Sequence, residues 1–307
     1  MHIYIIYEYM LLDELYTTYD NYLVYIKYSL GGSVLRRSLS IIMVIVMLLS
    51  ITTMVACTKK SSNEFRVGME CDYAPFNWTQ TEETAGTVPI SSGGYAGGYD
   101  VEIAKRIAQG LGKELVIVKI EWDGLTPALT SGRIDAIIAG MSPTEERKET
   151  VNFSVPYYDS DLVVVVLKDS EYASASSISD FSGARITGQL NTFHYTVIDQ
   201  IPNVDIQTAM ETFPAMIVAL DSGKIDGYIS ERPGAVSAAA SNPNITFVEF
   251  SSGNGFSYEP EEVQIAVALD KKNKDLDKIN AIINGITTSE RETYMINALN
   301  TQPLIAE

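Results

Sequence analysis

The stretch ALTSGRIDAIIA at residues 128–139 returns 91 positions later as ALDSGKIDGYIS at residues 219–230. Seven of the twelve paired residues are identical. Each copy ends an apolar helix, continues through Ser-Gly and enters a short apolar run, which is the pattern of a helix, a turn and a strand. The repeat therefore predicts two similar α/β lobes. Because open α/β sheets bind ligands at the carboxyl ends of their strands, we expect one cleft between the lobes.

Strand and helix signals alternate from Phe65 onward, which predicts a mostly parallel sheet flanked by helices in each lobe. Apolar runs predict strands at 65–69, 114–120, 134–139, 162–167, 184–188, 246–250 and 263–269. Predicted helices include one capped by Asp100, one from Thr192 to Gln200, and 273–299 with a break near Thr287. Residues 73–98, rich in Gly, Ser and Pro, are expected to form a long loop.

The chain is expected to pass between the lobes twice. We assign residues 65–160 and 255–307 to the first lobe and residues 161–254 to the second. The two hinge crossings are then expected near Ser160 and within residues 253–258.

Composition excludes several classes of function. The net charge of −17 argues against a nucleic-acid partner, because phosphate binding needs clustered Lys and Arg. No phosphate-binding loop, dinucleotide fingerprint or Cys-x-x-Cys motif occurs. His194 is the single histidine after residue 56, so a Ser–His hydrolase or a histidine metal cluster is not expected. We therefore expect no catalytic residue, metal or cofactor.

The N-terminal part carries a targeting signal. Arg36-Arg37 precede a long apolar run that leads to Met54-Val55-Ala56-Cys57, which resembles the lipobox of bacterial lipoproteins. We expect a signal peptide over 36–56, a lipidated Cys57 and a tether over 57–64; a plain transmembrane anchor is the alternative. Residues 1–35 are interpreted as an over-extended start or as a genuine extension. Lipidation of Cys57 would leave Cys71 without a disulfide partner.

The strand ends carry the candidate site. Ser142-Pro143-Thr144-Glu145 reads as a capping box with proline at the first helical position, and free N–H groups there favour an anion. Arg147 lies one turn further on, where its guanidinium can hold a carboxylate. In the second lobe, Asn191-Thr192 offers another helix start. Glu231 ends the second repeated strand and can accept a hydrogen bond from an ammonium group, so the set is complementary to a zwitterionic amino acid.

Five segments together resemble the polar amino-acid family of ABC-transporter solute-binding proteins, which has the type II periplasmic-binding fold. They are VGMECDYAPFNW, GGYDVEIAKRIA, WDGLTPAL, AGMSPTEERKETVNFSVPYY and GQLNTFHYT. The resemblance covers residues 65–300 and implies that Arg147 binds the α-carboxylate and Glu231 the α-ammonium. It implies a side-chain pocket formed by Glu70, Tyr73 and Trp122. The remaining expected contacts are Ala139, Gly140, Met141, Ser142, Asn191, Thr192 and Phe193.

The resemblance implies a lipid-anchored, extracytoplasmic binding protein of the Gram-positive type, which delivers a free amino acid to an ABC permease and its ATPase. Glu70 and the aromatic pair favour arginine or lysine as ligand, with glutamine second. An alternative is a cyclohexadienyl or arogenate dehydratase on the same fold, for which Glu231 and His194 are the candidate acid–base pair. A ligand-sensing module is a further alternative.

Overall fold

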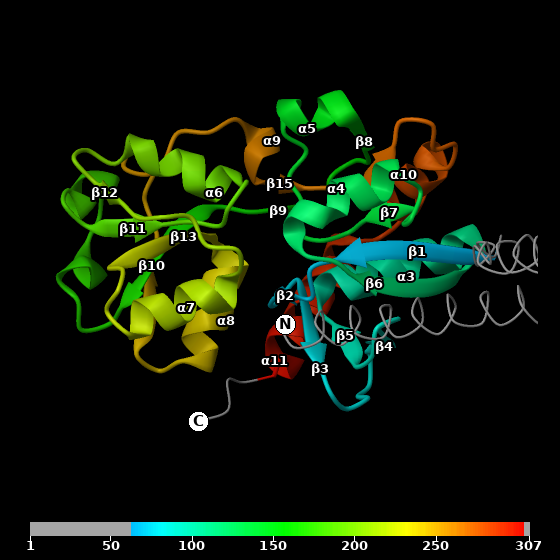
Figure 1. Cartoon of the computed structure of the whole chain (residues 1–307), viewed down its shortest axis with the longest axis horizontal. Coiled ribbons are helices and arrows are strands. Elements are labelled where there is room, and N and C mark those ends of the chain that lie inside the picture. Colours follow the sequence, from blue (N-terminus) through cyan, green and yellow to red (C-terminus); the bar gives the residue numbers. More distant parts are fainter. Residues whose placement is uncertain (1–62, 304–307) are drawn as a thin grey trace, which may run out of the picture. The chain divides into compact units, whose positions relative to one another are not determined.

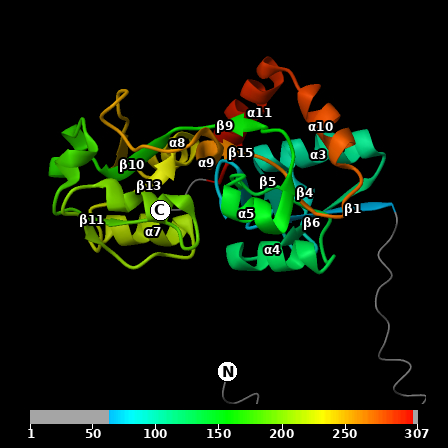
Figure 2. The ribbon, with the colours of Figure 1, turned by 90° about the horizontal axis from the view of Figure 1, so that it is seen from above.

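The computed structural model describes residues 63–303. The predicted extension, signal peptide and lipidated Cys57 lie outside the described residues. Residues 63–303 form two lobes, which Figures 1 and 2 show from two directions. Within this range no helix combines the length and apolar character needed to cross a membrane.

The first lobe is built on a five-stranded sheet in the order β6-β1-β7-β16-β8. β1 is parallel to both β6 and β7, whereas β16 is antiparallel to both β7 and β8. The strands are β1 (Glu64–Met69), β6 (Glu114–Lys119), β7 (Ala136–Ile137), β8 (Val151–Phe153) and β16 (Ala268–Asp270).

The second lobe repeats this plan in the order β12-β11-β13-β10-β14. β11 is parallel to β12 and β13, and β10 is antiparallel to β13 and β14. The strands are β10 (Leu162–Leu167), β11 (Arg185–Thr187), β12 (Asp205–Ile206), β13 (Gly227–Glu231) and β14 (Ile245–Val248). Five of the six residues of β10 are buried, as its run of β-branched residues predicts.

The α/β class is confirmed. Four of the five strands in each sheet run in the same direction, and one antiparallel strand, β16 in the first lobe and β10 in the second, makes each sheet mixed. The chain enters β10 and β16 from the opposite lobe and not through a helical crossover, so nothing forces these strands to run parallel to their neighbours. The two crossing segments are β9 (Tyr158–Asp159) and β15 (Gln264–Ile265), which pair with each other in antiparallel fashion. They lie between the lobes in Figure 1.

Phe256 and Tyr258 pack against the core of the second lobe. The side chains that follow the predicted boundary at residue 255 therefore still contact the second lobe. The second crossing lies at β15, some residues later than expected.

The repeated sequence forms the same unit in each lobe. α4 (Trp122–Thr130) leads to β7, and α7 (Phe213–Asp221) leads to β13, which is the middle strand of its sheet as β7 is of its own. Asp135 and Asp226, identical in the two copies, accept from the backbone N–H groups of Arg66 and Arg185 at 2.9 and 2.8 Å. The repeat thus predicts both the local structure and its place in each sheet.

The other helices lie around the two sheets. In the first lobe α3 contacts α10, α11 and β6, and in the second α8 contacts β10, β13 and β14. The helices are α3 (Tyr99–Leu111), α5 (Glu145–Thr150), α6 (Phe193–Thr196), α8 (Arg232–Ser241), α9 (Pro260–Val263), α10 (Leu276–Asn284) and α11 (Thr288–Thr301). The 3₁₀ helices are η1 (Glu171–Ser174), η2 (Ile178–Phe181) and η3 (Val197–Gln200). The expected break near Thr287 is confirmed, since Thr287 caps α11.

The expectation of a long loop over 73–98 is wrong. These residues form most of a small sheet in the order β2-β3-β5-β4. The strands are β2 (Asp72–Tyr73), β3 (Asn77–Gln80), β4 (Val88–Pro89) and β5 (Tyr95–Gly97). Strands of two to four residues are too short to show the alternation of apolar and polar side chains that identifies a strand, and the many Gly, Ser and Pro residues around them favour a loop prediction.

Asp100 does not cap α3. The N-cap is Gly98, and Asp100 is the second residue of the helix. Its carboxylate is fully buried and accepts from the Tyr157 hydroxyl at 2.6 Å and the Asn77 amide at 2.7 Å. The side chain therefore joins α3 to the small sheet and to the segment that precedes β9.

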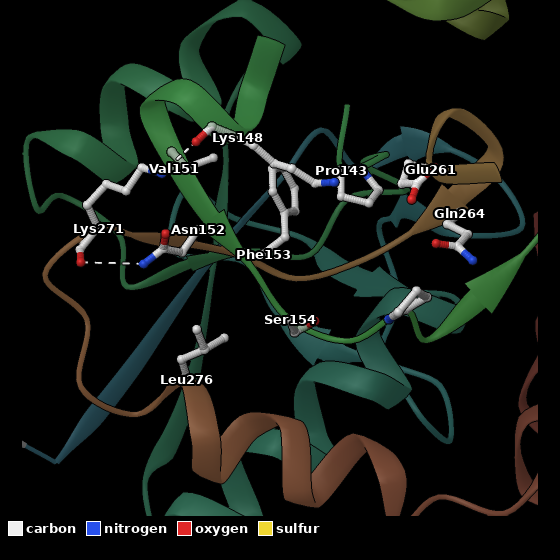
Figure 3. Close-up of a pocket in the computed structure, with 11 residues that line it drawn as sticks. Pro143, Lys148, Val151, Asn152, Phe153, Ser154, Glu261, Gln264, Lys271 and Leu276 are labelled. Atoms are coloured by element: carbon white, nitrogen blue, oxygen red, sulfur yellow. Dashed lines mark hydrogen bonds between the residues drawn. The ribbon is translucent and has the colours of Figure 1, made fainter. Parts of the chain in front are cut away.

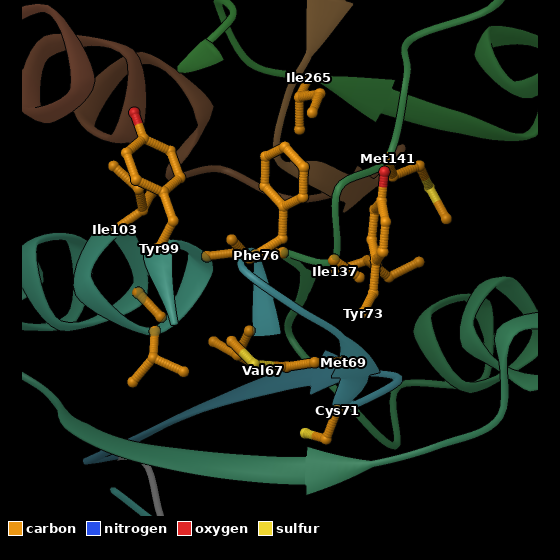
Figure 4. Packing of buried hydrophobic residues seen from close by; sticks show 14 of the residues in the cluster. Val67, Met69, Cys71, Tyr73, Phe76, Tyr99, Ile103, Ile137, Met141 and Ile265 are labelled. Carbon is orange, nitrogen blue, oxygen red and sulfur yellow. The ribbon is translucent and has the colours of Figure 1, made fainter. Parts of the chain in front are cut away.

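The core of the first lobe continues up to the cleft. Figure 4 shows Tyr73, Phe76, Tyr99 and Met141 among the apolar side chains packed above β1. Phe76 lies edge-on to Tyr99, with ring centroids 6.3 Å apart. Buried aromatic packing of this kind provides a rigid floor for side chains that line the cleft.

Candidate functional site

A small pocket lies where the two lobes meet. It has a volume of about 20 Å³, room for about one water molecule, because side chains from both lobes fill the cleft. The lining residues come from both lobes: Tyr73, Trp122, Gly140, Ser142, Arg147, Gln189, Thr192, Phe193, His194, Glu231 and Glu262.

Arg147 projects from α5, whose start differs from the expected capping box. The N-cap is Thr144, whose hydroxyl accepts from the Arg147 backbone N–H at 3.4 Å, so Ser142 and Pro143 precede the helix. Because the Thr144 backbone is extended, the helix begins at Glu145, two residues later than a cap at Ser142 would place it. Ser142 instead contributes its carbonyl oxygen to the guanidinium group.

The guanidinium of Arg147 has no carboxylate partner among residues 63–303. It donates to the carbonyl oxygens of Ser142 at 3.0 Å and Asn191 at 3.3 Å, and it lies 5.1 Å above the Trp122 ring. Burial lowers the pKa of Arg147 to about 10, so it remains a cation at neutral pH. A half-buried cation held only by neutral acceptors is suited to an anionic ligand group.

Glu231 is the corresponding acidic group of the second lobe. Only 2% of it is exposed, and its Oε1 lies 3.1 Å from Nε2 of His194. Burial raises the pKa of Glu231 to about 8, and burial together with the nearby Arg147 charge lowers the pKa of His194 to about 3. The contact is therefore a hydrogen bond of a neutral imidazole and not an ion pair. The second oxygen, Oε2, has no hydrogen-bond partner in the described chain.

Glu70 lies behind the pocket wall. Both of its carboxylate oxygens accept from Nε2 of Gln189 at 3.1 Å, across the two lobes. Burial raises the pKa of Glu70 to about 7, and the hydrogen bond from Gln189 opposes that shift. Access of a ligand cation to Glu70 requires the Gln189 amide to move.

The two expected aromatic walls have different neighbours. Tyr73 stacks on Phe213 with ring centroids 4.2 Å apart, whereas Trp122 lies under Arg147. Gly140 adopts a φ of 63°, and a Cβ added there would lie 2.8 Å from the Tyr73 ring. A glycine is therefore required where the strand-end loop passes Tyr73.

The structure brings most of the predicted site residues to one place. Eight of them line the pocket: Tyr73, Trp122, Gly140, Ser142, Arg147, Thr192, Phe193 and Glu231. Asn191 takes part through its carbonyl oxygen, and Glu70 through Gln189. Ala139 and Met141 are buried in the core of the first lobe. The roles of these residues as ligand contacts stay predictions.

Gln189 and Glu262 are not identified by sequence reasoning, which interprets His194 as a polar residue of the cleft wall or as a partner of Glu231 in the enzyme alternative. Gln189 comes directly before Leu190-Asn191 at the end of a predicted strand, which is a signal that could have identified it. The structure also brings Glu231 and His194 together, as that alternative requires. Among residues 63–303 no group of three or more acidic, His or Cys side chains is placed to hold a metal.

A wider pocket of about 470 Å³ lies beside α5 in the first lobe, and Figure 3 shows its lining. Two of its polar side chains are paired: Asn152 donates to the Lys271 carbonyl at 3.4 Å, and Lys148 lies 2.7 Å from Glu145. None of its lining side chains is a buried polar group without a partner. By contrast, three of the six such atoms in residues 63–303 belong to residues that line the cleft pocket, namely Tyr73, His194 and Glu231.

Known proteins show the same fold and similar sequences. A Streptococcus pneumoniae amino-acid ABC-transporter substrate-binding protein bound to L-arginine superposes with a TM-score of 0.68. It is 26% identical, and the match covers 79% of this chain and 96% of that one. The substrate-binding protein of another amino-acid ABC transporter is 31% identical, with a TM-score of 0.65 and coverage of 78% and 100%.

Two relatives extend the comparison. A protein of Campylobacter jejuni named a probable histidine-binding protein is 32% identical over 75% of this chain and 80% of its own length. The ABC transporter arginine-binding protein 1 of Escherichia coli is 26% identical over 72% of this chain and 87% of its own length. The model of the bacterial extracellular solute-binding proteins, family 3, matches residues 65–296, and the chain belongs to this family.

Proposed function

We propose that the protein binds a free amino acid in this cleft and delivers it to an ABC permease driven by its ATPase. One observation carries the proposal: Arg147 and Glu231 come from opposite lobes, line one small pocket, and have no partner of opposite charge within residues 63–303. A zwitterion supplies both missing partners, because its carboxylate fits the guanidinium and its ammonium fits the carboxylate. Relatives named as histidine-, arginine- and cystine-binding proteins support this class of ligand.

We infer a basic side chain for the ligand, with arginine or lysine first and glutamine second. A buried carboxylate is costly unless it is paired, and within the described part of the chain the hydrogen-bond partner of the Glu70 carboxylate is the neutral Gln189 amide. A guanidinium or ammonium that displaces this amide would leave Glu70 ionised and paired. A ligand carboxylate in the same place would be repelled.

Competition calorimetry across the twenty amino acids tests this specificity, with Glu70→Gln as the paired variant. Arginine or lysine should bind most tightly to the wild type, and Glu70→Gln should reduce that preference while leaving glutamine affinity nearly unchanged. Tight binding of aspartate or glutamate would contradict the assignment. Unchanged arginine affinity in Glu70→Gln would show that Glu70 is not the selector.

We further propose that the two lobes close on the ligand as bodies, with the first crossing near Ser160, as expected, and the second at β15 rather than at residue 255. The paired crossing segments β9 and β15 supply a narrow hinge between them. The hydrogen bonds from Gln189 to Glu70 and from Arg147 to Asn191 hold the lobes together. The stacking of Tyr73 on Phe213 and the bond from Asn191 to Asp123 also join the lobes, so all of these contacts would have to break for the site to open.

The proposed location is the outer face of the cell membrane of a Gram-positive type of cell. The support is the basic pair Arg36-Arg37, the apolar run that follows it, and the small residue before Cys57. A lipid on Cys57 would then hold the binding lobes at the membrane.

A dehydratase remains the second candidate because Glu231 and His194 are in contact. With its pKa raised to about 8, Glu231 carries a proton at neutral pH and could donate it to a leaving group. Incubation with prephenate and arogenate decides this point. Release of carbon dioxide that depends on Glu231 would establish the enzyme, and binding of an amino acid without turnover would exclude it.

A further inference from the structure

The internal repeat draws attention to Phe213, an aromatic residue of the second lobe that is not among the predicted ligand contacts. Phe213 follows Trp122 by 91 positions, which is the offset of the repeat, and each ring belongs to the first residue of its helix, α7 or α4. The Thr212 hydroxyl caps α7 by accepting from the Ala215 N–H at 3.3 Å. Because Trp122 lines the cleft pocket, the repeat predicts that Phe213 faces the same cleft from the opposite lobe.

Phe213 does meet the first lobe there, face to face. Its ring stacks on the ring of Tyr73, with centroids 4.2 Å apart and an angle of 12° between the planes. Tyr73 belongs to β2, which α7 contacts. The rings cover each other, so that only 6% of Phe213 and 4% of Tyr73 is exposed. Lobe closure without a ligand therefore brings two flat aromatic faces together.

We propose that Phe213 is a ligand-contacting residue and that the side chain of the bound amino acid lies between the rings of Phe213 and Tyr73. We call the space between these two rings the aromatic slot. The inference rests on the proposed function and names the group that the side-chain pocket takes, a flat guanidinium. It places arginine ahead of lysine as the ligand.

The structure gives Tyr73 a different aromatic partner from the one expected. Trp122 lies 5.1 Å beneath the guanidinium of Arg147, the group proposed to hold the ligand carboxylate. Trp122 therefore contributes to the carboxylate end of the site. The ring that faces Tyr73 across the cleft is Phe213.

Each ring of the aromatic slot is held by its own lobe. Phe213 meets His194 and Tyr228 of the second lobe edge-on, at centroid distances of 5.8 and 6.3 Å. Tyr73 packs against Phe76 of the first lobe at 5.0 Å. When the lobes move apart, each ring stays with its own neighbours, and the aromatic slot opens between them.

A guanidinium suits such a slot because it is flat and carries a charge. Carbon atoms pack best about 3.5–4.0 Å apart, so a flat group between two rings sets their centroids roughly 7–8 Å apart. The ligand then replaces one ring–ring contact with two ring–ligand contacts. A cation over an aromatic face is also attracted by the ring quadrupole, and a guanidinium can lie flat against both rings at once.

The aromatic slot lies close to the buried carboxylate of Glu70. Nε2 of Gln189 donates to both oxygens of Glu70 and, at 3.0 Å, to the carbonyl oxygen of Glu211. Glu70 precedes Tyr73 by three residues, and Glu211 precedes Phe213 by two. The Gln189 amide therefore joins the two segments that carry the rings. A guanidinium held between the rings is placed to replace this amide on Glu70.

Calorimetry of L-arginine, L-lysine and L-alanine tests the aromatic slot in the full-length wild type, Phe213→Leu and Phe181→Leu. The side chain of L-alanine is too short to enter the slot, so the ratio of its Kd to that of L-arginine reports the side-chain contacts alone. Phe181 is the matched control in the second lobe. It also stacks on a tyrosine, Tyr172, at 5.4 Å, and it lies outside the cleft lining.

We expect Phe213→Leu to reduce the ratio roughly 2- to 30-fold and Phe181→Leu to leave it unchanged. The loss should be smaller when L-lysine replaces L-arginine, because an ammonium is not flat. Phe213→Tyr keeps the ring and should restore most of the ratio. A purely structural role of Phe213 would weaken L-arginine and L-alanine by the same factor.

Nuclear magnetic resonance of the wild type with L-arginine gives a readout that does not depend on a variant folding. The side-chain methylene protons of the bound ligand should shift upfield under the two ring currents. They should also show nuclear Overhauser contacts to the ring protons of Phe213, which the Phe213→Tyr variant assigns. A saturated complex without these contacts would overturn the inference.

The outcomes distinguish the inference from the proposed function. An equal ratio in the wild type and Phe213→Leu means that the aromatic slot is wrong while amino-acid binding stands. If the wild type binds none of the three amino acids, the proposed ligand class is wrong and the inference falls with it.

Discussion

The guanidinium of Arg147 in the first lobe donates to the carbonyl oxygen of Asn191 in the second lobe, 3.3 Å away. The same carbonyl accepts from the indole N–H of Trp122 at 3.4 Å. Arg147, which we propose to bind the ligand carboxylate, therefore also forms a hydrogen bond between the lobes. Ligand binding and lobe closure use one side chain.

Arg147→Ala should weaken amino-acid binding by roughly 2–5 kcal/mol, which is on the order of 30-fold or more in Kd. The reason is the loss of the cation opposite the ligand carboxylate. Arg147→Lys should recover only part, because an ammonium cannot make the planar two-point contact. Lys148→Ala removes an exposed surface pair with Glu145 and should change Kd less than about threefold. Equal effects of the Arg147→Ala and Lys148→Ala substitutions would remove this role from Arg147.

Asn191→Gly should destabilise the closed state and raise the Kd by roughly 2- to 10-fold. The substitution removes the hydrogen bond that the Asn191 side-chain amide donates to the Asp123 carboxylate at 2.9 Å. Asn191 has a φ of 55°, which glycine adopts without strain. Asn203→Gly is the matched control, since Asn203 has a φ of 54° and lies outside the cleft lining. Calorimetry of both variants checks the expectation, and an equal Kd for the two would argue against it.

Small-angle scattering should show a smaller radius of gyration with saturating amino acid than without it. The described structure has the lobes in contact, and the free protein is expected to populate an open state. The change should be smaller in Asn191→Gly if the cross-lobe bond supports closure. Superimposable profiles with and without ligand would contradict a closing mechanism.

Asp100 should make the free energy of unfolding depend on pH between about 4 and 6. Burial raises its pKa to about 6, whereas an unfolded Asp titrates near 3.9. A pKa raised by folding means that the contribution of the protonated carboxyl is present below about pH 4 and is lost as the pH rises through 6.

The stability difference between wild type and Asp100→Asn should therefore fall by about 3 kcal/mol across that window. Urea denaturation at half-unit pH steps measures it, and the subtraction removes the contributions of the other carboxyl groups. A difference that stays constant from pH 4 to 7 would show that Asp100 is ionised throughout.

Cys57→Ser should release the protein from the membrane fraction or leave its signal peptide uncleaved, because the substitution removes the lipid-bearing thiol. Cys71→Ala is the control: Cys71 is a buried free cysteine of the core, so this variant should stay with the membrane. Intact-mass measurement of the membrane fraction reads the modification directly. An unmodified Cys57 there would refute the anchor.

The parts of the fold that sequence predicts well are those with a local cause. The 128–139 and 219–230 copies carry their helix stops at Gly132 and Gly223, whose φ values of 75° and 69° favour glycine. The buried run at 162–167 likewise needs no distant information. The four short strands after Cys71 depend on pairing with one another, which composition does not reveal.

The candidate site shows the same division. Arg147 and Glu231 can be identified at the ends of repeated strands, whereas Gln189 becomes a candidate only when closure brings it against Glu70. The sequence does not fix the start of α5, because both Ser142 and Thr144 can cap a helix. The backbone geometry selects Thr144. Contacts across a cleft depend on the relative placement of two lobes, which neither lobe's sequence encodes alone.

Calorimetry with L-arginine and two of its analogues tests the central claim most directly. Agmatine lacks the carboxylate that Arg147 would bind, and the α-hydroxy analogue lacks the ammonium that Glu231 would bind. L-Arginine should bind, and each analogue should lose on the order of 30-fold or more in affinity. Agmatine or the hydroxy acid binding as tightly as L-arginine would contradict recognition of the zwitterion by Arg147 and Glu231.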